Sequence, residues 1–342
     1  MPLTAAAVVV NEPGGHLVAS TIDVPPPAGT WVRVRVMASG VCNADIGTAA
    51  ARNPGAGFPV TPGHEVAGVI TELGDGVEGW AVGDRVAVGW FGGSCGHCVL
   101  CRDGDVVHCP DRRVPGQSYP GGWAESITVP ADALARIPDG LDFFEAAPFG
   151  CAGVTVFNAV RQAGVRAGGR VAVFGLGGLG HLAVQFAARL GYHTTAISRG
   201  AGRAEAAERL GAHHYIDSSV EEPGAALARR GGADLIVYSA SSTEPVSELL
   251  AGLRVHGQIT LLGADANSVA IPTSQLVLNG IKVTGHLTGS PRDTEEAMQF
   301  AVNTGVRPVI ERLPLEKAGD AVARLKTGAP RFRIVLDATE AR

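Results

Sequence analysis

Four of the six cysteines of the chain lie close together in a Gly-rich lobe, residues 92–112. They follow one another at intervals of three, three and eight residues, at Cys95, Cys98, Cys101 and Cys109. Four thiolates in one short segment suit a tetrahedral zinc ion, and a site with all four positions filled is structural. Two local disulfides or an iron–sulfur cluster are the alternatives for the same spacing.

The two remaining cysteines, Cys42 and Cys151, lie far apart in the sequence, with His64 between them. These three residues would make a zinc site whose fourth position stays open for water or substrate, which is the arrangement that catalysis needs. Glu65 would lie next to the metal as a transient ligand or an outer carboxylate. Asp45 could accept the other ring proton of His64 and hold its tautomer. We therefore predict a second, catalytic zinc site.

A glycine-rich loop separates an apolar run, 170–174, from a helical stretch, 179–190. Glycines there permit a tight turn and a close approach of the backbone, and the amino end of a helix presents free amide donors to a pyrophosphate. We predict that a nicotinamide dinucleotide binds at this loop, through Gly175, Gly177, Gly178, Leu179 and Gly180.

The segment about 20 residues beyond this loop distinguishes the two nicotinamide cofactors. A carboxylate there would bind the ribose hydroxyls of NAD, but the chain has Ser198 and Arg199, with Arg203 close behind. A hydroxyl and two guanidinium groups suit a 2′-phosphate instead. We therefore predict that NADP(H) is preferred over NAD(H).

The elements that must position these residues change in character near residue 150. Upstream, short alternating runs broken by Pro and Gly predict a β-rich domain, with strands over 31–36, 66–72 and 85–88. Downstream, helical stretches separate apolar strands, which predicts a parallel, doubly wound sheet with strands over 170–174, 193–197, 215–216, 233–238, 257–262 and 282–285. A helix over 293–303 and a strand over 333–336 are predicted to return to the first domain. The expected domains are therefore 1–150 with 290–342, and 151–289.

Composition and charge exclude several classes of protein. With 342 residues, 46% of them hydrophobic, the chain can bury a full core. Its formal charge is −5 and its Lys and Arg residues are scattered, so we expect no nucleic-acid or membrane partner. No stretch approaches the roughly 18 apolar residues of a spanning helix, and the amino-terminal segment does not read as a secretion signal. We expect a cytoplasmic enzyme whose cysteines stay reduced.

With these motifs in hand, the chain resembles the zinc-containing alcohol dehydrogenases of the medium-chain dehydrogenase/reductase superfamily over essentially its whole length. The matching segments are Gly40-Val41-Cys42, Pro62-Gly63-His64-Glu65, the four-cysteine lobe, Ala152-Gly153-Val154-Thr155, the glycine loop and Arg333-Ile334-Val335-Leu336. The resemblance implies an α/β protein with a GroES-like catalytic domain and a Rossmann domain. It also implies an active site in the cleft between them, where zinc polarises a carbonyl during hydride transfer.

The same resemblance assigns roles to single residues. Cys42, His64 and Cys151 correspond to the catalytic zinc ligands, and Glu65 corresponds to the adjacent carboxylate. Arg333 corresponds to a contact of the cofactor pyrophosphate. The substrate pocket of the family has a large side chain at the position of Trp90, and with Phe91 it would shape an apolar pocket.

The chain departs from the family at the proton relay. Family members that oxidise alcohols usually have Ser or Thr two residues after the first zinc ligand and often His three residues later, whereas this chain has Ala44 and Gly47. A proton would have to exchange through water, Asn43 or a cofactor hydroxyl. The first interpretation is still an NADP(H)-dependent zinc alcohol dehydrogenase or carbonyl reductase. An NADPH-dependent reductase of C=N or C=C bonds is the alternative, and the resemblance suggests a homodimer or homotetramer.

Overall fold

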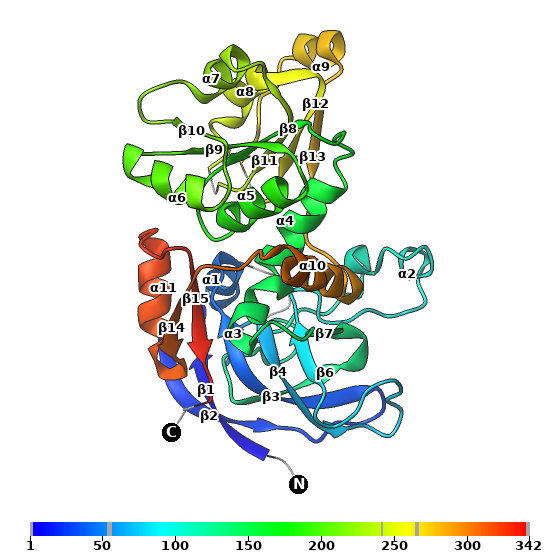
Figure 1. Cartoon of the computed structure of the whole chain (residues 1–342). Helices are drawn as coiled ribbons and strands as arrows, with labels where there is room; N and C mark the ends of the chain where they lie inside the picture. Colours follow the sequence, from blue (N-terminus) through cyan, green and yellow to red (C-terminus); the bar gives the residue numbers. More distant parts are fainter. Residues whose placement is uncertain (1–2, 53–56, 241, 264–266, 340–342) are drawn as a thin grey trace. The chain divides into compact units, whose positions relative to one another are not determined.

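The computed structural model describes residues 3–52, 57–240, 242–263 and 267–339. The chain divides into two compact units, both drawn in Figure 1: unit 1 is Met1–Val154 with Thr288–Arg342, and unit 2 is Thr155–Leu287. Unit 1 is therefore discontinuous in sequence.

Unit 1 is built on a seven-stranded sheet with the order β14-β15-β3-β4-β5-β7, in which β6 also pairs with β3. Along β3 the valines at 32, 34 and 36 are buried while the side chains between them are less so, because alternate residues of a strand face opposite sides of a sheet. The strands are β3 (Trp31–Gly40), β4 (Val66–Leu73), β5 (Arg85–Val88), β6 (Ser126–Pro130), β7 (Leu134–Arg136), β14 (Ile310–Pro314) and β15 (Arg333–Asp337). A separate antiparallel pair is formed by β1 (Leu3–Val10) and β2 (Leu17–Val24).

The last strand of the chain lies inside this sheet. β15 runs antiparallel to β3, with Val335 opposite Gly40, so the carboxyl-terminal segment lies directly beside the segment that leads into Cys42 (Figure 1). The helices of unit 1 are short apart from α10, which Ser290 and Asp293 cap at its start. They are α1 (Asn43–Ala49), α2 (Val99–Arg102), α3 (Phe143–Ala146), α10 (Pro291–Thr304) and α11 (Ala318–Lys326), and α4 (Ala152–Arg161) crosses the border between the units.

Unit 2 contains a six-stranded, wholly parallel sheet with the order β10-β9-β8-β11-β12-β13. This is the order of a doubly wound sheet, in which the direction of winding reverses between the first strand and the fourth. The strands are β8 (Arg170–Phe174), β9 (His193–Ser198), β10 (His214–Asp217), β11 (Ala233–Tyr238), β12 (Leu253–Leu261) and β13 (Lys282–Gly285). The helices between them are α5 (Gly180–Arg189), α6 (Ala204–Arg209), α7 (Pro223–Arg229), α8 (Val246–Leu249) and α9 (Thr273–Asn279). The predicted α/β class, a β-rich domain and a doubly wound sheet, is confirmed.

The observed elements differ from the predicted ones mostly at their ends. Strand β12 begins four residues before the predicted start, and β3 continues four residues beyond the predicted end, to Gly40. The sequence did not indicate β1, β2, β6, β7 or β14. Most of β2 is exposed and its polar and apolar residues do not alternate strictly, which removes the signal that would have identified it.

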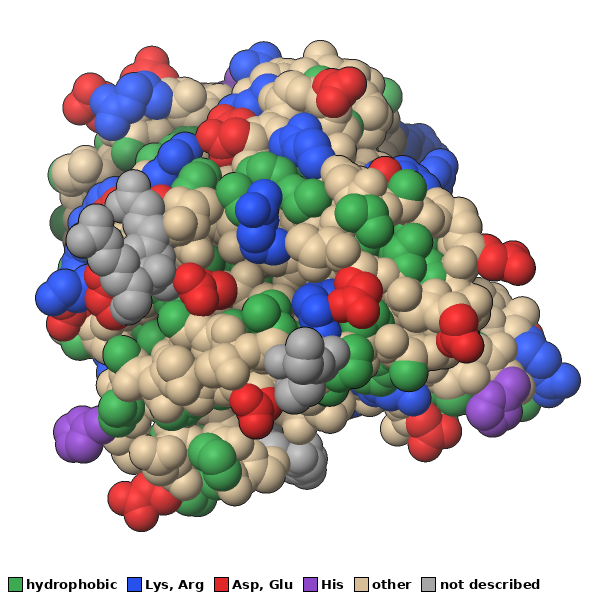
Figure 2. Space-filling view, turned by 90° about the horizontal axis from the view of Figure 1, so that it is seen from below, with side chains coloured by type: hydrophobic (Ala, Val, Ile, Leu, Met, Phe, Trp, Pro, Cys, Tyr) green, Lys and Arg blue, Asp and Glu red, His purple; other side chains and the backbone are tan. Residues whose placement is uncertain are grey.

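Among the described residues, no single helix is long and apolar enough to cross a membrane, and one bent pair passes that test on length and composition alone. On the face drawn in Figure 2, acidic and basic side chains are interspersed.

Candidate active site

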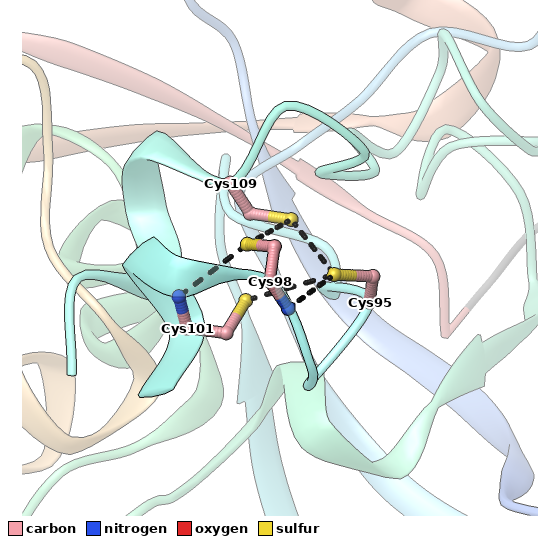
Figure 3. Close-up of side chains that lie close together, drawn as sticks. All are labelled: Cys95, Cys98, Cys101 and Cys109. Atoms are coloured by element: carbon pink, nitrogen blue, oxygen red, sulfur yellow. Dashed lines mark hydrogen bonds between the residues drawn. The ribbon is translucent and has the colours of Figure 1, made fainter. Parts of the chain in front are cut away.

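The four sulfur atoms of the lobe converge in unit 1 (Figure 3). Sγ of Cys109 lies 3.6 Å from that of Cys95 and 3.9 Å from that of Cys98, and the sulfurs of Cys95 and Cys101 are 4.0 Å apart. Four sulfurs bound to one zinc ion at about 2.3 Å form a tetrahedron with edges of about 3.8 Å, so these separations fit zinc. They are far longer than the roughly 2.05 Å of a disulfide bond, and all four cysteines are free.

Backbone amides of the lobe point at its sulfurs. The amide of Cys98 donates to Sγ of Cys95 at 3.4 Å, and the amide of Cys101 donates to Sγ of Cys98 at 3.5 Å as α2 begins. Backbone hydrogen bonds from His97 and Cys98 lower the pKa of Cys95 to about 6. Burial and hydrogen bonds with the neighbouring thiols raise the pKa of Cys98 and of Cys109 instead. Within the metal-free lobe, the backbone therefore favours a thiolate, the form that binds a metal, at Cys95.

A second group of ligand atoms lies in the interior of unit 1. Sγ of Cys42, Sγ of Cys151, a ring nitrogen of His64 and a carboxylate oxygen of Glu65 all lie within 4.8 Å of one another. Nε2 of His64 and Oε2 of Glu65 are buried and have no hydrogen-bond partner among the described residues. A buried polar atom without a partner is costly, and a metal ion at this point would satisfy both atoms. The donor set of sulfur, imidazole and carboxylate fits zinc.

Asp45 holds two of these segments together. Its Oδ2 accepts from the amide of Cys42 at 2.9 Å, and its Oδ1 accepts from the amide of Gly63 at 3.1 Å. The same Oδ1 lies 2.7 Å from Nδ1 of His64, in a pair that is almost wholly buried. Burial lowers the pKa of His64, but the Asp45 carboxylate outweighs it and raises that pKa well above its ordinary value. In the neutral ring, the form that binds a metal, a proton held on Nδ1 by Asp45 leaves Nε2 as the ligand atom.

Cys151 is positioned by a close contact between two glycines. A Cβ atom on Gly89 would lie 2.1 Å from the carbonyl oxygen of Gly150, so only glycine fits there. The amide of Trp90 donates to the same carbonyl at 3.1 Å. Trp90 is therefore hydrogen-bonded to the residue that directly precedes Cys151. Phe91 is buried.

The structure does not test the substrate pocket that was predicted at Trp90 and Phe91. Arg112 stacks over the Trp90 ring at 5.6 Å. An apolar cavity of about 390 Å³ in unit 1 is lined instead by residues around Trp31 and Tyr119. The pocket at Trp90 stays a prediction.

Glu65 forms an ion pair with Arg333, and the two side chains are 0% and 4% exposed. Burial raises the pKa of Glu65 to about 7, although the Arg333 guanidinium opposes that shift. A Cβ atom on Gly40 would lie 2.0 Å from Oε2 of Glu65, so the glycine makes room for the carboxylate. The sequence had indicated Arg333 only as a pyrophosphate contact, and its pairing with a residue 268 positions away carried no local signal.

The two thiols of the inner cluster are coupled to each other. A hydrogen bond from Cys151 lowers the pKa of Cys42 well below its ordinary value, against the effect of burial. The hydrogen bond to Cys42, with burial, raises the pKa of Cys151. The two shifts therefore have opposite directions, with the pKa of Cys42 lowered and that of Cys151 raised.

Three residues of interest lie on α1. Asn43 is exposed at the first position of the helix, whereas Ala44 and Gly47 are half-buried. Neither Ala44 nor Gly47 carries a side chain that could transfer a proton. At these two positions the family usually has Ser or Thr and often His as a proton relay. The helix that follows Cys42 therefore carries no such relay at Ala44 and Gly47.

In unit 2 the glycine loop joins β8 to α5. Gly175 has φ +96°, and a Cβ atom on Gly180 would lie 1.7 Å from the carbonyl oxygen of Gly175. A Cβ atom on Gly177, in contrast, would meet nothing within 4 Å. Two glycines are thus required by the fold, and the third faces open space of the kind that a pyrophosphate would fill at a helix amino end. Gly178 and Leu179 complete the loop.

The three residues predicted to select the cofactor follow β9. Ser198 is its last residue and is buried, and Arg199 is exposed. Arg203 lies half-buried and donates from a guanidinium nitrogen to the carbonyl oxygen of Leu176, inside the glycine loop, at 2.6 Å. That contact, which the sequence did not indicate, brings Arg203 to the predicted dinucleotide site.

Comparisons with known proteins show the family to which the chain belongs. The family model for the alcohol dehydrogenase GroES-like domain matches residues 28–139, and the one for zinc-binding dehydrogenases matches residues 178–303. An alcohol dehydrogenase of Aspergillus sp. (strain MF297-2) is 40% identical over 98% of each chain. An NADP-dependent alcohol dehydrogenase C of Mycobacterium bovis is 34% identical over 98% of this chain and 95% of that relative. A cinnamyl alcohol dehydrogenase structure from Sorghum bicolor has a TM-score of 0.91 and 32% identity over 99% of each chain.

The glycine loop yields a prediction that separates folding from binding. Gly180→Ala should lower the free energy of unfolding by roughly 1–3 kcal/mol, because its methyl group meets a backbone carbonyl. Gly177→Ala should leave the melting temperature within error and weaken NADPH binding about tenfold, because its methyl group enters open space. Thermal unfolding and fluorescence titration with NADPH measure the two effects. Equal effects of both variants on stability would contradict this division.

Asp45 yields a second prediction. Asp45→Asn should accelerate the loss of metal from the inner cluster to a chelator by about 10–100-fold, because the His64 tautomer is no longer fixed by a carboxylate. Asp105→Asn is the matched control, since Asp105 also lies 2.7 Å from a histidine Nδ1, that of His108, but on the surface. Identical chelation kinetics for the two variants would refute a role for Asp45 in holding the ligand.

Proposed function

The chain belongs to the zinc-containing alcohol dehydrogenases of the medium-chain dehydrogenase/reductase superfamily, and from that premise we propose that it transfers a hydride between NADP(H) and a small aldehyde, ketone or alcohol. The observation that carries the proposal is the unpartnered Nε2 of His64, buried within 4.8 Å of the sulfurs of Cys42 and Cys151. Zinc held there would supply a Lewis acid that polarises the carbonyl oxygen, while the nicotinamide supplies the hydride.

The chain's own residues divide the remaining work. Cys42, His64 and Cys151 hold the metal, and Asp45 keeps the His64 tautomer that exposes Nε2. Glu65, paired with Arg333, keeps a carboxylate beside the metal as a transient ligand or an outer partner. We assign a second, structural zinc ion to the four-cysteine lobe, which gives two zinc ions per chain. Arg333 is also proposed to contact the pyrophosphate.

The reaction also needs a path for one proton, because hydride transfer alone leaves an alkoxide. Ala44 and Gly47 offer none. We propose that the proton comes from water, from the side of α1 where Asn43 is exposed, or through a cofactor hydroxyl. A specific consequence of the missing relay is a second candidate function, the reduction of C=N or C=C bonds, which needs no hydroxyl relay at that position.

The preference for NADP(H) rests on the end of β9. No carboxylate stands at this position, where one would repel a 2′-phosphate, and Ser198, Arg199 and Arg203 can donate to that phosphate. Asp217, at the end of the next strand, is engaged within the protein, since its Oδ1 accepts from Gly200 and Ser219. The name of the Mycobacterium bovis relative as NADP-dependent is consistent with this assignment.

The assembly is proposed from the family alone, whereas the location and the classes of partner are proposed from composition and charge. We propose a homodimer or homotetramer in the cytoplasm that acts on a small molecule and has neither nucleic acid nor a membrane as a partner.

Zinc analysis with two ligand variants tests the proposed function. The unaltered protein should contain about two zinc ions per chain and oxidise NADPH with aldehydes or ketones. His64→Ala should lose one zinc ion and reduce the turnover rate by at least about 100-fold with little change in melting temperature. Cys98→Ser should also lose one zinc ion, and its main effect should be a lower melting temperature, because a structural metal stabilises the fold. Its effect on the turnover rate should be smaller, because the lobe is separate from the inner cluster.

The substrate panel distinguishes the two candidate reactions. Aldehydes, ketones, imines and enones are assayed with NADPH and with NADH. Reduction of aldehydes or ketones supports the first proposal and means that water replaces the relay. Activity confined to imines or conjugated alkenes supports the second, and an inactive protein with two zinc ions refutes both.

The cofactor assignment makes its own prediction. Arg199→Asp should reverse the ratio of kcat/KM for NADPH over NADH, by roughly 100-fold or more, because it replaces a cation with an anion beside the 2′-phosphate. Arg209→Asp is the control, since Arg209 is exposed on α6 and pairs with Glu205. An unchanged ratio in Arg199→Asp would remove the assignment.

A further inference from the structure

The turn that carries Arg199 is held from the neighbouring strand. The hydroxyl of Tyr215, on β10, lies 3.0 Å from the carbonyl oxygen of Ser198 and 2.8 Å from that of Gly200. Its single proton is shared between these two carbonyls, which belong to the residues on either side of Arg199. One side chain therefore restrains the backbone before and after the predicted phosphate ligand.

Asp217 completes this restraint from the same strand. Its Oδ1 accepts from the amide of Gly200 at 2.7 Å, and the amide and hydroxyl of Ser219 donate to the same oxygen. The hydrogen bond from the Ser219 hydroxyl, with those from the two amides, lowers the pKa of Asp217. Gly200 has φ +90°, a conformation that glycine adopts without strain. The amide of Gly200 therefore donates to Asp217, and its carbonyl oxygen accepts from Tyr215, so both backbone groups bind side chains of β10.

The surroundings of the Tyr215 hydroxyl connect it to the cofactor loop. Burial and the charge of Asp217 raise the pKa of Tyr215, and the charge of Arg203 opposes that shift. Arg203 in turn donates to Leu176 in the glycine loop. Arg199, in contrast, is exposed and makes no hydrogen bond or ion pair with any residue that the structure describes.

We propose that Tyr215 is a positioning residue for the 2′-phosphate of NADP(H), acting through Arg199. Its hydroxyl adds a hydrogen bond to two carbonyl oxygens that also accept from the backbone amides of Ser218 and Arg203, and it fixes the direction in which Arg199 leaves the turn. A ligand site whose parts are held before binding loses less conformational entropy on binding. The inference rests on the proposed preference for NADP(H) and names the residue that supports it.

The test is Tyr215→Phe in the full chain, which removes the hydroxyl and keeps the ring. The KM for NADPH should rise roughly 3–10-fold, with kcat and the KM for NADH within about twofold, because only the phosphate contact depends on the turn. Tyr192→Phe is the matched control, since the Tyr192 hydroxyl donates to a single carbonyl, that of Val165, at 3.3 Å in the same unit. In an Arg199→Ala background, Tyr215→Phe should add little to the KM for NADPH, because residues that act together are not additive.

Each outcome has one meaning. An equal rise of both KM values, or an additive effect on top of Arg199→Ala, would show a merely structural role and overturn the inference. If Arg199→Asp removes the preference for NADPH and Tyr215→Phe leaves it intact, the inference fails while the cofactor assignment stands. If the unaltered protein does not prefer NADPH, the cofactor assignment fails and the inference fails with it.

Discussion

The ion pair of Glu65 and Arg333 constrains the arrangement of unit 1, since both charges are withdrawn from water. A charge in the protein interior is tolerated only if a partner meets it there. Glu65 directly precedes β4, and Arg333 begins β15, the last strand of the chain. The pair therefore requires the carboxyl-terminal strand to lie in the sheet with a fixed register beside β3. Gly40, opposite Val335 in that register, is the position at which the Glu65 carboxylate finds room, and Cys42 follows two residues later.

The need to compensate buried charges also explains why the inner cluster suits a divalent cation. With both thiols ionised, Cys42, Cys151 and Glu65 carry negative charge, and Arg333 is the positive side chain paired within this group. Asp45 adds a further carboxylate, which His64 faces through Nδ1. Such a collection of buried anions is compensated when a cation binds at the atoms that lack partners.

Features that depend on neighbours in sequence could be predicted, and those that depend on distant contacts could not. The four cysteines of the lobe come from one segment of 15 residues, and the glycines stand between a strand and a helix that are recognisable by their pattern. The grouping of Cys42, His64 and Cys151 was predicted from their residue types, and the family resemblance assigned the same three residues as catalytic zinc ligands. Nothing near Arg333 indicated that it meets Glu65, and nothing near Tyr215 indicated that it binds the turn after β9. Such pairings are set by strand order and register, which short-range patterns do not encode.

The absence of a relay at Ala44 and Gly47 is not repaired by the nearest hydroxyl on the same helix. Thr48 is buried, and its Oγ1 donates to the carbonyl oxygen of Ala44 at 3.1 Å. The same atom accepts from the side chain of Gln117 at 3.2 Å. To carry a proton toward a substrate, Thr48 would have to break both bonds inside the protein, at a cost that a relay open to water avoids. The described side chains of α1 therefore include no hydroxyl that is free to carry a proton, which agrees with the proposed route through water or a cofactor hydroxyl.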